Sequence, residues 1–372
     1  MLVKLLSTIR IGLKAAGLLP LIKRVLYAPD NQQLKPRSTI GFRYRLKALI
    51  EQANFTSVKE VHDLPAIHAY WTNRYIVPKL RQFGYSSIED FFLRNLQRAF
   101  LESGDSPKRC VSLGAGNCDF EVRLARLLVS LGMRDFVIEC VDFNQTMLER
   151  GAERAAAQGV TEYIVAVRAD LNDWTPVGKY DAVIANMSLH HVINLEGLFD
   201  SIKTTLKKSG LFLTFDMVGR NGHMRWPEAL DIVNQFWQQM PREFQYNRML
   251  AQHQVVYENF DCSKSGFEGI RAQDILPLLL QRFQFASCIG FANIIEPFVD
   301  RAVGYNFDPK REWDRNFIDR VHLRDEAEMA AGRVKPTHLL AAMSVGRPER
   351  MEYEGRMTPE FCARSVDAST SV

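Results

Sequence analysis

Residues 111–125, VSLGAGNCDFEVRLA, hold the combination of residues with the clearest chemical use in the chain. A short apolar run leads directly into Gly114 and Gly116, and a stretch of helical periodicity follows. Glycine permits positive φ and the close approach of a ligand to the backbone, while a helix start offers free N–H groups. The pattern predicts a ligand-binding loop between a strand and a helix, although a G-x-G pair alone is a weak signal.

Polar residues stand at the ends of the next three apolar runs along the chain. They are Asp142, Asp170 and Asn186. The carboxyl ends of parallel strands meet at one edge of a sheet, where doubly wound proteins bind their ligands. An acidic side chain at the end of the second strand can accept hydrogen bonds from both hydroxyls of a ribose. These residues therefore predict a binding crevice for a ligand that contains a nucleoside.

Two classes of cofactor compete for such a loop. Dinucleotides favour the pattern G-x-G-x-x-G, but position 119 in this chain is Asp rather than a third glycine. A carboxylate at the start of the following helix would repel a pyrophosphate. It would instead suit a cofactor with a cationic amino group and no phosphate, such as S-adenosylmethionine. A dinucleotide oxidoreductase is the minor alternative.

The elements that must position these residues follow from the apolar periodicity. Strands are expected at 109–113, 136–141, 163–168, 180–185 and 211–215, and helices at 119–130, 145–158 and 195–208. Gly210 is expected to stop the last of these helices. Alternating strands and helices at this spacing predict a parallel sheet that is covered on both faces. Two more strands are expected at 285–291 and 338–345.

With these elements in place, the chain resembles the class I S-adenosylmethionine-dependent methyltransferases. The resemblance rests on VSLGAGNCDFEVRLA, Asp142, ADL at 169–171, SLHHV at 188–192 and KKSGLFLTFD at 207–216. It implies an α/β fold with a Rossmann-like, seven-stranded, mostly parallel sheet, whose last two strands form an antiparallel hairpin. It also implies S-adenosylmethionine as the cofactor and methyl transfer by in-line displacement as the reaction.

The resemblance also implies cofactor-binding roles for a set of residues: Gly114, Ala115, Gly116, Asn117, Asp119, Asp142, Phe143, Asp170, Leu171, Asn186 and Met187. The glycine loop would pass under the methionine part of the cofactor. Asp142 would bind the ribose hydroxyls and Phe143 would lie against the adenine. Asp170 would accept from the adenine amino group. Asn186 and Met187 would lie beside the sulfonium and its methyl group.

Two positions depart from the family pattern. Many members have an acid where this chain has Ser112, and a third glycine where it has Cys118. The first departure removes a carboxylate that often helps to hold the methionine part, and Asp119 or Glu121 could replace it. The second departure implies a slightly different loop.

Three residues are candidates for catalysis. Asp216, at the end of the fifth strand, is a candidate general base or a carboxylate that positions the substrate, with a helix cap or a loop role as the alternative. His190 and His191 either order the segment after the fourth strand or take part in acid–base chemistry. Adjacent residues on a helix face different ways, and no third ligand has suitable spacing, so no metal site is expected.

Charge is distributed unevenly along the 372 residues. Residues 1–50 contain ten Lys or Arg and one acid, so they carry +9, and the rest of the chain carries −5. A basic face on the folded domain, as nucleic-acid binding requires, is therefore not expected. The six cysteines form no CxxC pair, which indicates reduced thiols and a cytoplasmic protein. The composition excludes collagen, low-complexity disorder and a small disulfide-rich fold.

Three regions are expected along the chain. Residues 1–105 form a basic helical region. Its aromatic run HAYWTNRY, at 68–75, forms either a lid over the active site or ordinary packing. Residues 1–28 either pack on the protein or contact the inner face of an anionic membrane. Residues 106–346 form the methyltransferase domain, with a helical insertion at about 220–283 on the substrate side. Residues 347–372 form a tail.

Two motifs that do not occur after the fourth strand narrow the class of acceptor. Asn186-Met-Ser is neither the Asn-Pro-Pro-aromatic motif of enzymes that methylate exocyclic amines nor a Pro-Cys pair for cytosine chemistry. A small-molecule, lipid or sugar-type acceptor is therefore expected. The alternative is a non-catalytic binding or scaffold member of the same fold. The acceptor's identity, the atom that is methylated and the oligomeric state stay open at this point.

Overall fold

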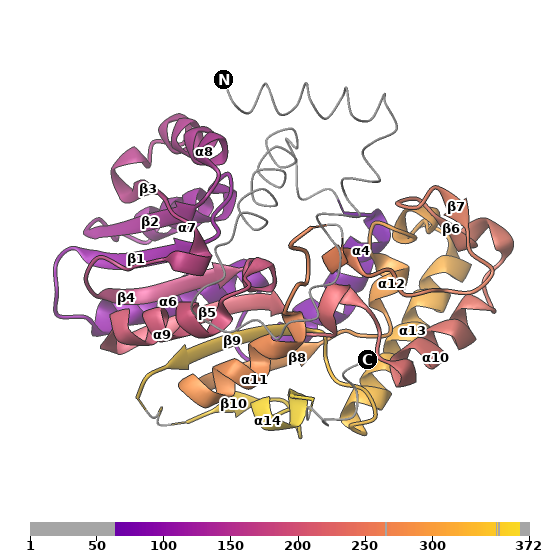
Figure 1. Ribbon diagram of the computed structural model, residues 1–372. Helices are drawn as coiled ribbons and strands as arrows, with labels where there is room; N and C mark the ends of the chain where they lie inside the picture. The colour runs from indigo at the N-terminus through magenta and orange to yellow at the C-terminus, as the bar shows by residue number, and fades with distance from the viewer. Residues whose placement is uncertain (1–63, 265, 347, 349, 365–372) are drawn as a thin grey trace.

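The computed structural model describes residues 64–264, 266–346, 348 and 350–364. Its centre is one sheet of eight strands in the order β10-β8-β9-β5-β4-β1-β2-β3 (Figure 1). The strands are β1 Lys108–Leu113, β2 Phe136–Asp142, β3 Ile164–Arg168, β4 Tyr180–Asn186, β5 Leu206–Met217, β8 Gln284–Phe291, β9 His338–Ser344 and β10 Glu352–Tyr353. The predicted α/β fold with a mostly parallel sheet is confirmed.

Strand register brings the predicted binding residues to one edge of the sheet. β1 pairs in parallel with both β2 and β4, and β2 pairs in parallel with β3. The pairing of Leu113 with Val141 and of Asp142 with Arg168 aligns the carboxyl ends of three strands. β9 runs antiparallel to both β5 and β8, as expected for the last two strands of the family pattern.

Two sequence-based expectations for the sheet and its helices are wrong. The sheet has eight strands rather than seven, because β10 pairs in parallel with β8, inside the segment for which a tail is expected. The helix expected at 195–208 ends at Thr205, because Leu206 already has extended backbone angles and begins β5. Gly210, expected to stop this helix, lies inside β5 instead.

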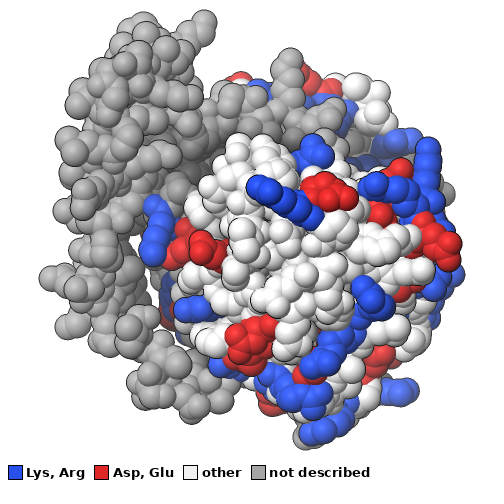
Figure 2. Space-filling model, turned by 90° about the vertical axis from the view of Figure 1, so that its right-hand side faces the viewer, with Lys and Arg blue, Asp and Glu red and all other residues white. Residues whose placement is uncertain are grey.

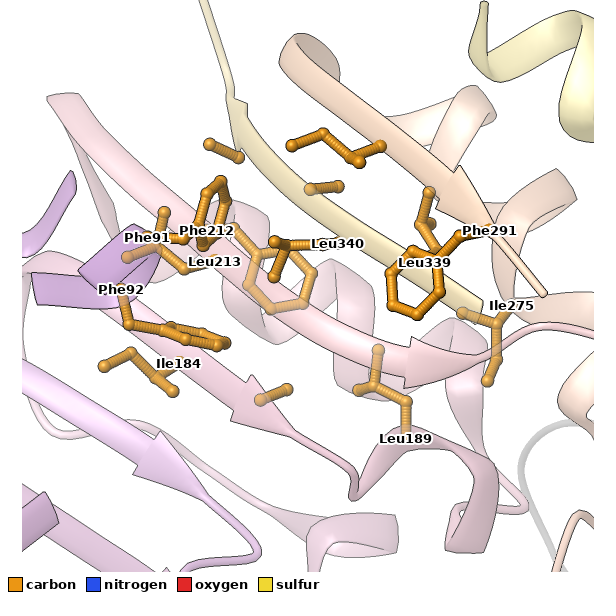
Figure 3. Close-up of a cluster of buried hydrophobic side chains, with 14 of the residues drawn as sticks. Phe91, Phe92, Ile184, Leu189, Phe212, Leu213, Ile275, Phe291, Leu339 and Leu340 are labelled. Carbon is orange, nitrogen blue, oxygen red and sulfur yellow. The ribbon is translucent and has the colours of Figure 1, made fainter. Parts of the chain in front are cut away.

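Helices cover both faces of the sheet. Side chains on both faces of β4 are therefore buried, at six consecutive positions, 180–185. The covering helices are α6 Ile88–Glu102, α7 Asp119–Ser130, α8 Gln145–Ala157, α9 Leu195–Thr205, α11 Ala272–Arg282 and α14 Pro359–Cys362. α6, α7 and α8 contact one another in turn, and α11 contacts both α9 and α14. Figure 3 shows Phe91 and Phe92 of α6 beside Ile184 and Leu213 of the sheet, in the middle of the core.

A second group of elements lies beside the sheet, at the right of Figure 1. It comprises α4 Ala66–Trp71, the π-helix η1 Thr72–Ile76, α5 Val77–Gln82, α10 Pro227–Trp237, the hairpin β6 Tyr246–Asn247 and β7 Gln252–His253, α12 Glu296–Val299 and α13 Glu312–Ala330. Single 3-10 turns connect the elements: η2 Thr161–Tyr163, η3 Leu171–Asp173, η4 Leu189–His191, η5 Asn221–His223, η6 Arg242–Gln245, η7 Cys262–Lys264 and η8 Gly304–Asn306. The insertion at 220–283 is therefore helical, as expected, with a small hairpin that sequence analysis does not predict.

The aromatic run at 68–75 packs against α13. The hydroxyl of Tyr70 donates to Asp319 at 2.9 Å, and Nε1 of Trp71 donates to Nδ1 of His322 at 3.3 Å. No helix among the described residues is long and apolar enough to cross a membrane. Residues 1–28, which are expected either to pack on the protein or to contact a membrane, lie outside the described residues. All six cysteines are described, and each is a free thiol.

Candidate active site

The loop after β1 has backbone geometry that requires glycine. Gly114 and Gly116 have φ values of +76° and +54°. A Cβ on Gly114 would lie 2.5 Å from the Cβ of Ser188, so space as well as φ excludes other residues. Cys118, where many relatives have glycine, also has a positive φ of 54°. The amide of Gly114 donates to the carbonyl of Val141 at 2.8 Å and holds the loop against β2.

Asp142, at the end of β2, is bonded to this loop. One of its carboxylate oxygens accepts from the amide of Gly116 at 2.9 Å, and the other accepts from the amide of Asn144 at 2.8 Å. The cap of α8 is Asn144, so Asp142 is not a simple helix cap. Burial raises the pKa of Asp142. Each oxygen retains a second lone pair, so Asp142 can hold the loop and still accept from a ligand hydroxyl.

The end of β3 is tied to the segment that follows β4. Asp170 caps η3 by accepting from the amide of Asn172 at 2.9 Å. Oδ1 of Asn172 then accepts from the amides of Ile193 and Asn194, at 2.8 and 2.9 Å. Asp170 therefore stabilises a turn, and it also lines the cavity described below.

Asp216 fixes the segment after β4 from inside the protein. Its Oδ2 accepts from the amides of Ser188 and Leu189 at 2.9 and 2.7 Å. Its Oδ1 accepts from the amide of Met217 at 2.8 Å and lies 2.6 Å from Nδ1 of His190. The carboxylate is fully buried. Its contacts hold the segment after β4 in place, and we expect this positioning role rather than that of a general base for Asp216.

The two adjacent histidines have different surroundings. His190 is buried, and its Nε2 lies 3.4 Å from one carboxylate oxygen of Glu268. His191 lines the cavity, and its Nδ1 lies 3.7 Å from the other oxygen. Burial opposes a charge on His190, but Asp216 and Glu268 outweigh it and raise the pKa of His190 to about 10. Burial and the charge on His190 lower the pKa of His191 to about 4.

Glu268 comes from the insertion and joins the histidines to it. One of its oxygens lies 2.9 Å from Nε2 of His223. Burial opposes the charge of Glu268, but hydrogen bonds with His190 and His223 lower its pKa. His190, His191 and Glu268 offer ligand atoms within 4.8 Å of one another, an arrangement that the sequence spacing did not predict.

A cavity of about 260 Å³ lies between these loops. All the residues with implied cofactor-binding roles line it, and so does His191, whereas Asp216 and His190 do not. The rest of the lining is Phe120, Glu121, Met147, Asn172, Ser188, Val192 and Phe267. The residues that the sequence indicated at the carboxyl ends of the strands thus lie around one cavity, to which the insertion adds Phe267.

The charge of the cavity lining selects between the two classes of cofactor. The lining contains the carboxylates of Asp119, Glu121, Asp142 and Asp170, but neither Lys nor Arg. A pyrophosphate would meet the carboxylates of Glu121, Asp142 and Asp170 without a Lys or Arg in the lining to offset them, whereas Asp119 is paired with Arg154 of α8. A cofactor with ribose hydroxyls, an adenine amino group and an ammonium group presents donors and positive charge to these acids. The residues present fit S-adenosylmethionine and do not fit a dinucleotide.

Residues 85–263 match the family model described as a methyltransferase domain. This segment runs from the start of α6 through β5 into the insertion, and it contains the glycine loop and both histidines. It is a methyltransferase domain. The match confirms the family that the sequence motifs indicate.

Individual relatives of the methyltransferase domain are distant. Malonyl-[acyl-carrier protein] O-methyltransferase 2 of Ilyobacter polytropus is 20% identical over 174 residues, which are 44% of this chain and 64% of that protein. A structure of geranyl diphosphate C-methyltransferase from Streptomyces coelicolor is 14% identical, with a TM-score of 0.40 over 74% of this chain and 84% of that one. An O-methyltransferase from a Brevibacillus brevis polyketide synthase multienzyme is 14% identical, with a TM-score of 0.39 over 78% and 85% of the two chains.

Glu268 and Phe267 are the residues of the insertion near this site that sequence reasoning missed. They lie in the insertion, more than 70 residues after His191, and no motif surrounds them. The amide of Ile270 donates to the carbonyl of His190 at 3.0 Å, and this contact brings the insertion to the histidines. A pairing this remote leaves no periodic signal in one sequence.

Proposed function

We propose that this chain is an S-adenosylmethionine-dependent methyltransferase that acts on a small-molecule, lipid or sugar-type acceptor by in-line displacement. The observation that carries the proposal is the single cavity that joins the glycine loop and the strand-end acids to His191. The bound cofactor supplies a methyl group on an activated sulfonium. The protein's own residues then need to align the reactants, exclude water and accept a proton where the acceptor has one to lose.

The cavity lining supports a defined direction for the cofactor. The glycine loop passes beside Asp142, which suits the ribose, and Asp170 with Leu171 lies at the end of the neighbouring strand, which suits the adenine. Asn186 and Met187 also line the cavity, at the start of the segment that leads to His191. Met187 has a φ of +54° and its amide donates to Phe215 at 2.7 Å, so the chain turns sharply there. We place the reacting methyl group between Met187 and His191.

His191 is the residue proposed to accept the acceptor's proton. It lines the cavity, and its lowered pKa keeps the imidazole neutral at neutral pH. Its Nδ1 lies 3.7 Å from Glu268, and the imidazole as a whole borders the space in which a hydroxyl acceptor would bind. General bases of this kind contribute to reactions in which an O–H bond is broken. The arrangement therefore favours a hydroxyl acceptor over an amine, which can react after desolvation alone.

The acceptor class is supported by the absence of Lys and Arg from the described cavity lining and by the name of one distant relative, an O-methyltransferase of malonyl-[acyl-carrier protein]. The alternative of a non-catalytic scaffold rested on Ser112, and the structure places another carboxylate, Glu121, against that serine. We therefore propose an active enzyme.

Calorimetric titration of the purified chain tests the cofactor. S-adenosylmethionine and S-adenosylhomocysteine should bind with micromolar affinity, and NAD and NADP should not bind. Asp142→Ala should weaken S-adenosylhomocysteine by about 1–3 kcal/mol, because ribose hydroxyls and the amide of Gly116 lose their acceptor. Asp142→Asn, which keeps the shape and one acceptor oxygen, should lose less. If neither S-adenosylmethionine nor S-adenosylhomocysteine binds the wild-type chain, the proposal is contradicted and a non-catalytic scaffold is favoured instead.

A further inference from the structure

We propose that Glu121 of α7 binds the α-ammonium group of the cofactor's methionine part, in place of the acid that related proteins carry at the position of Ser112. The inference rests on the proposed function, since it concerns the same cavity. It also answers a question that the sequence left open, because both Asp119 and Glu121 were candidates to replace that acid.

The side chain of Glu121 lies where the missing acid would be. Oε1 of Glu121 accepts from the hydroxyl of Ser112 at 2.6 Å, so the carboxylate from α7 meets the β1 position directly. Glu121 is 2% exposed and lines the cavity. Its second oxygen, Oε2, has no hydrogen-bond donor among the described residues. A buried carboxylate oxygen without a donor is costly, and a ligand donor at this place would offset that cost.

A second acceptor without a donor lies in the same loop. Oδ1 of Asn117 is buried and has no partner among the described residues, and Asn117 also lines the cavity. Asp119, the other candidate, forms an ion pair with Arg154 of α8, so its charge is already balanced. An ammonium group carries three N–H donors and a positive charge. It is the part of the cofactor that suits Glu121 and Asn117 together.

The charge state of Glu121 adds a measurable consequence. Burial raises the pKa of Glu121 to about 7, although the hydrogen bond from Ser112 acts to lower it. The other titratable or charged groups near it are Asp142, Arg123 and three thiols, Cys110, Cys118 and Cys140. Burial raises the pKa of the Cys110 thiol, and a hydrogen bond with Cys118 together with burial raises that of Cys140. Arg123 favours the ionised carboxylate of Glu121, and Asp142 opposes it. An ammonium group beside Glu121 would favour the ionised form, so binding near pH 7 should release part of a proton.

A pair of ligands separates this role from a general effect on the loop. S-adenosylhomocysteine contains the ammonium group, whereas methylthioadenosine keeps the nucleoside and lacks the amino-acid part. Glu121→Gln should weaken S-adenosylhomocysteine by roughly 10- to 100-fold, as loss of a hydrogen bond to a charged group does. The same variant should bind methylthioadenosine within about twofold of wild type. Its retained affinity for methylthioadenosine also shows that the variant is folded.

The double variant Ser112→Asp with Glu121→Gln is the matched rescue. It returns a carboxylate to the family position, next to the substituted side chain, and should recover most of the affinity for S-adenosylhomocysteine. Equal weakening of both ligands by Glu121→Gln would mean that Glu121 only supports the loop and would overturn the inference. Unchanged affinity for S-adenosylhomocysteine would also overturn it. If neither ligand binds the wild-type chain, the proposed function itself fails, which is a distinct result.

Proton release supplies a test that needs no successful variant. Titration of wild-type protein with S-adenosylhomocysteine at pH 7, in buffers of different ionisation enthalpy, should show release of a fraction of a proton. Release should fall toward zero at pH 9, where Glu121 is already ionised. Methylthioadenosine should release less at pH 7, because it does not bring the ammonium group. Equal release with both ligands would assign the effect to Asp142 and contradict the role of Glu121.

Discussion

At the scale of single residues, the site contains two neighbouring imidazoles whose pKa values are shifted in opposite directions. Asp216 and Glu268 lie on either side of His190 and stabilise its cation, although burial alone would lower its pKa. The same cation then disfavours a second proton on His191. His190 therefore works at a distance from the cavity, because it keeps His191 neutral and holds the segment after β4 in place.

Substitution of His191 tests its role as proton acceptor. His191→Gln should lower kcat by roughly 10²- to 10⁴-fold with a hydroxyl acceptor, the usual contribution of a general base. Affinity for S-adenosylhomocysteine should stay within about twofold. Because the pKa of His191 lies at about 4, the wild-type rate should be flat around neutral pH and fall only as the pH drops toward 4. The measurement is initial rates with methyl-labelled cofactor and the first hydroxyl acceptor found.

His223→Gln is the control for that substitution. His223 contacts the same carboxylate of Glu268 but is not part of the cavity lining. It should reduce the rate much less than His191→Gln. Similar losses from both variants would indicate that the histidines only hold Glu268, and that Glu268 itself accepts the proton.

At this scale, the sequence indicated the residues at the ends of strands, but it did not indicate the contacts that remote parts of the chain make with Asp216 and Glu268. Gly114, Asp142 and Asp170 were identifiable because each follows an apolar run directly. Asp216 was identified as a chemical residue, but its burial depends on three backbone amides that no sequence pattern shows. Glu268 was missed because its partners lie far away along the chain.

At the scale of elements, local signals predicted the first five strands and failed for α13. The segment 296–337 appears mixed and charged in sequence, yet Glu312–Ala330 is one helix. Its buried residues include the acids Asp314, Asp325 and Glu328 beside Phe317 and Val321, so an apolar stripe does not stand out. The helix is stabilised by specific polar contacts that periodicity does not detect.

Asp325 illustrates those contacts and gives a stability prediction. Its fully buried carboxylate accepts from the backbone amides of Asn293, Ile294 and Ile295, at 2.9 to 3.2 Å, and so joins α13 to the segment after β8. Asp325→Ala should lower the free energy of unfolding by about 3 kcal/mol, because three buried amides lose their acceptor. Urea unfolding followed by circular dichroism measures the change.

Two further variants of α13 serve as controls. Asp325→Asn keeps one acceptor oxygen, so its loss should be intermediate. Glu312→Ala removes an exposed acid from the first turn of the same helix and should change stability by no more than about 0.5 kcal/mol. A loss of less than 1 kcal/mol in Asp325→Ala would show that the segment after β8 does not depend on this carboxylate.

At the scale of the whole molecule, charge is separated along the chain rather than across the described surface. Figure 2 shows the end formed by the second group of helices, where Lys and Arg are interspersed with Asp and Glu around a largely uncharged centre. Residues 1–50 carry +9 and the remainder carries −5. Residues 1–50 are therefore the most basic part of the chain, and we expect attraction to an anionic surface to come mainly from them.

Within those residues, 1–28 combine apolar side chains with five Lys or Arg and no acid. We expect this segment to contact anionic membranes, because each basic residue near such a surface contributes about 1 kcal/mol and apolar side chains add burial. The full chain should sediment with vesicles containing phosphatidylserine, more weakly at high salt, and poorly with phosphatidylcholine alone.

The decisive comparison is between two altered chains of similar charge loss. Removal of residues 1–28 deletes five basic residues together with their apolar neighbours, and should abolish sedimentation with anionic vesicles. Substitution of the five basic residues at 35, 37, 43, 45 and 47 by Gln removes the same charge but leaves the apolar segment, and should reduce binding only in part. Equal binding by the full and shortened chains would exclude a membrane contact through residues 1–28. Equal losses in both altered chains would instead indicate that binding follows net charge alone, without apolar insertion.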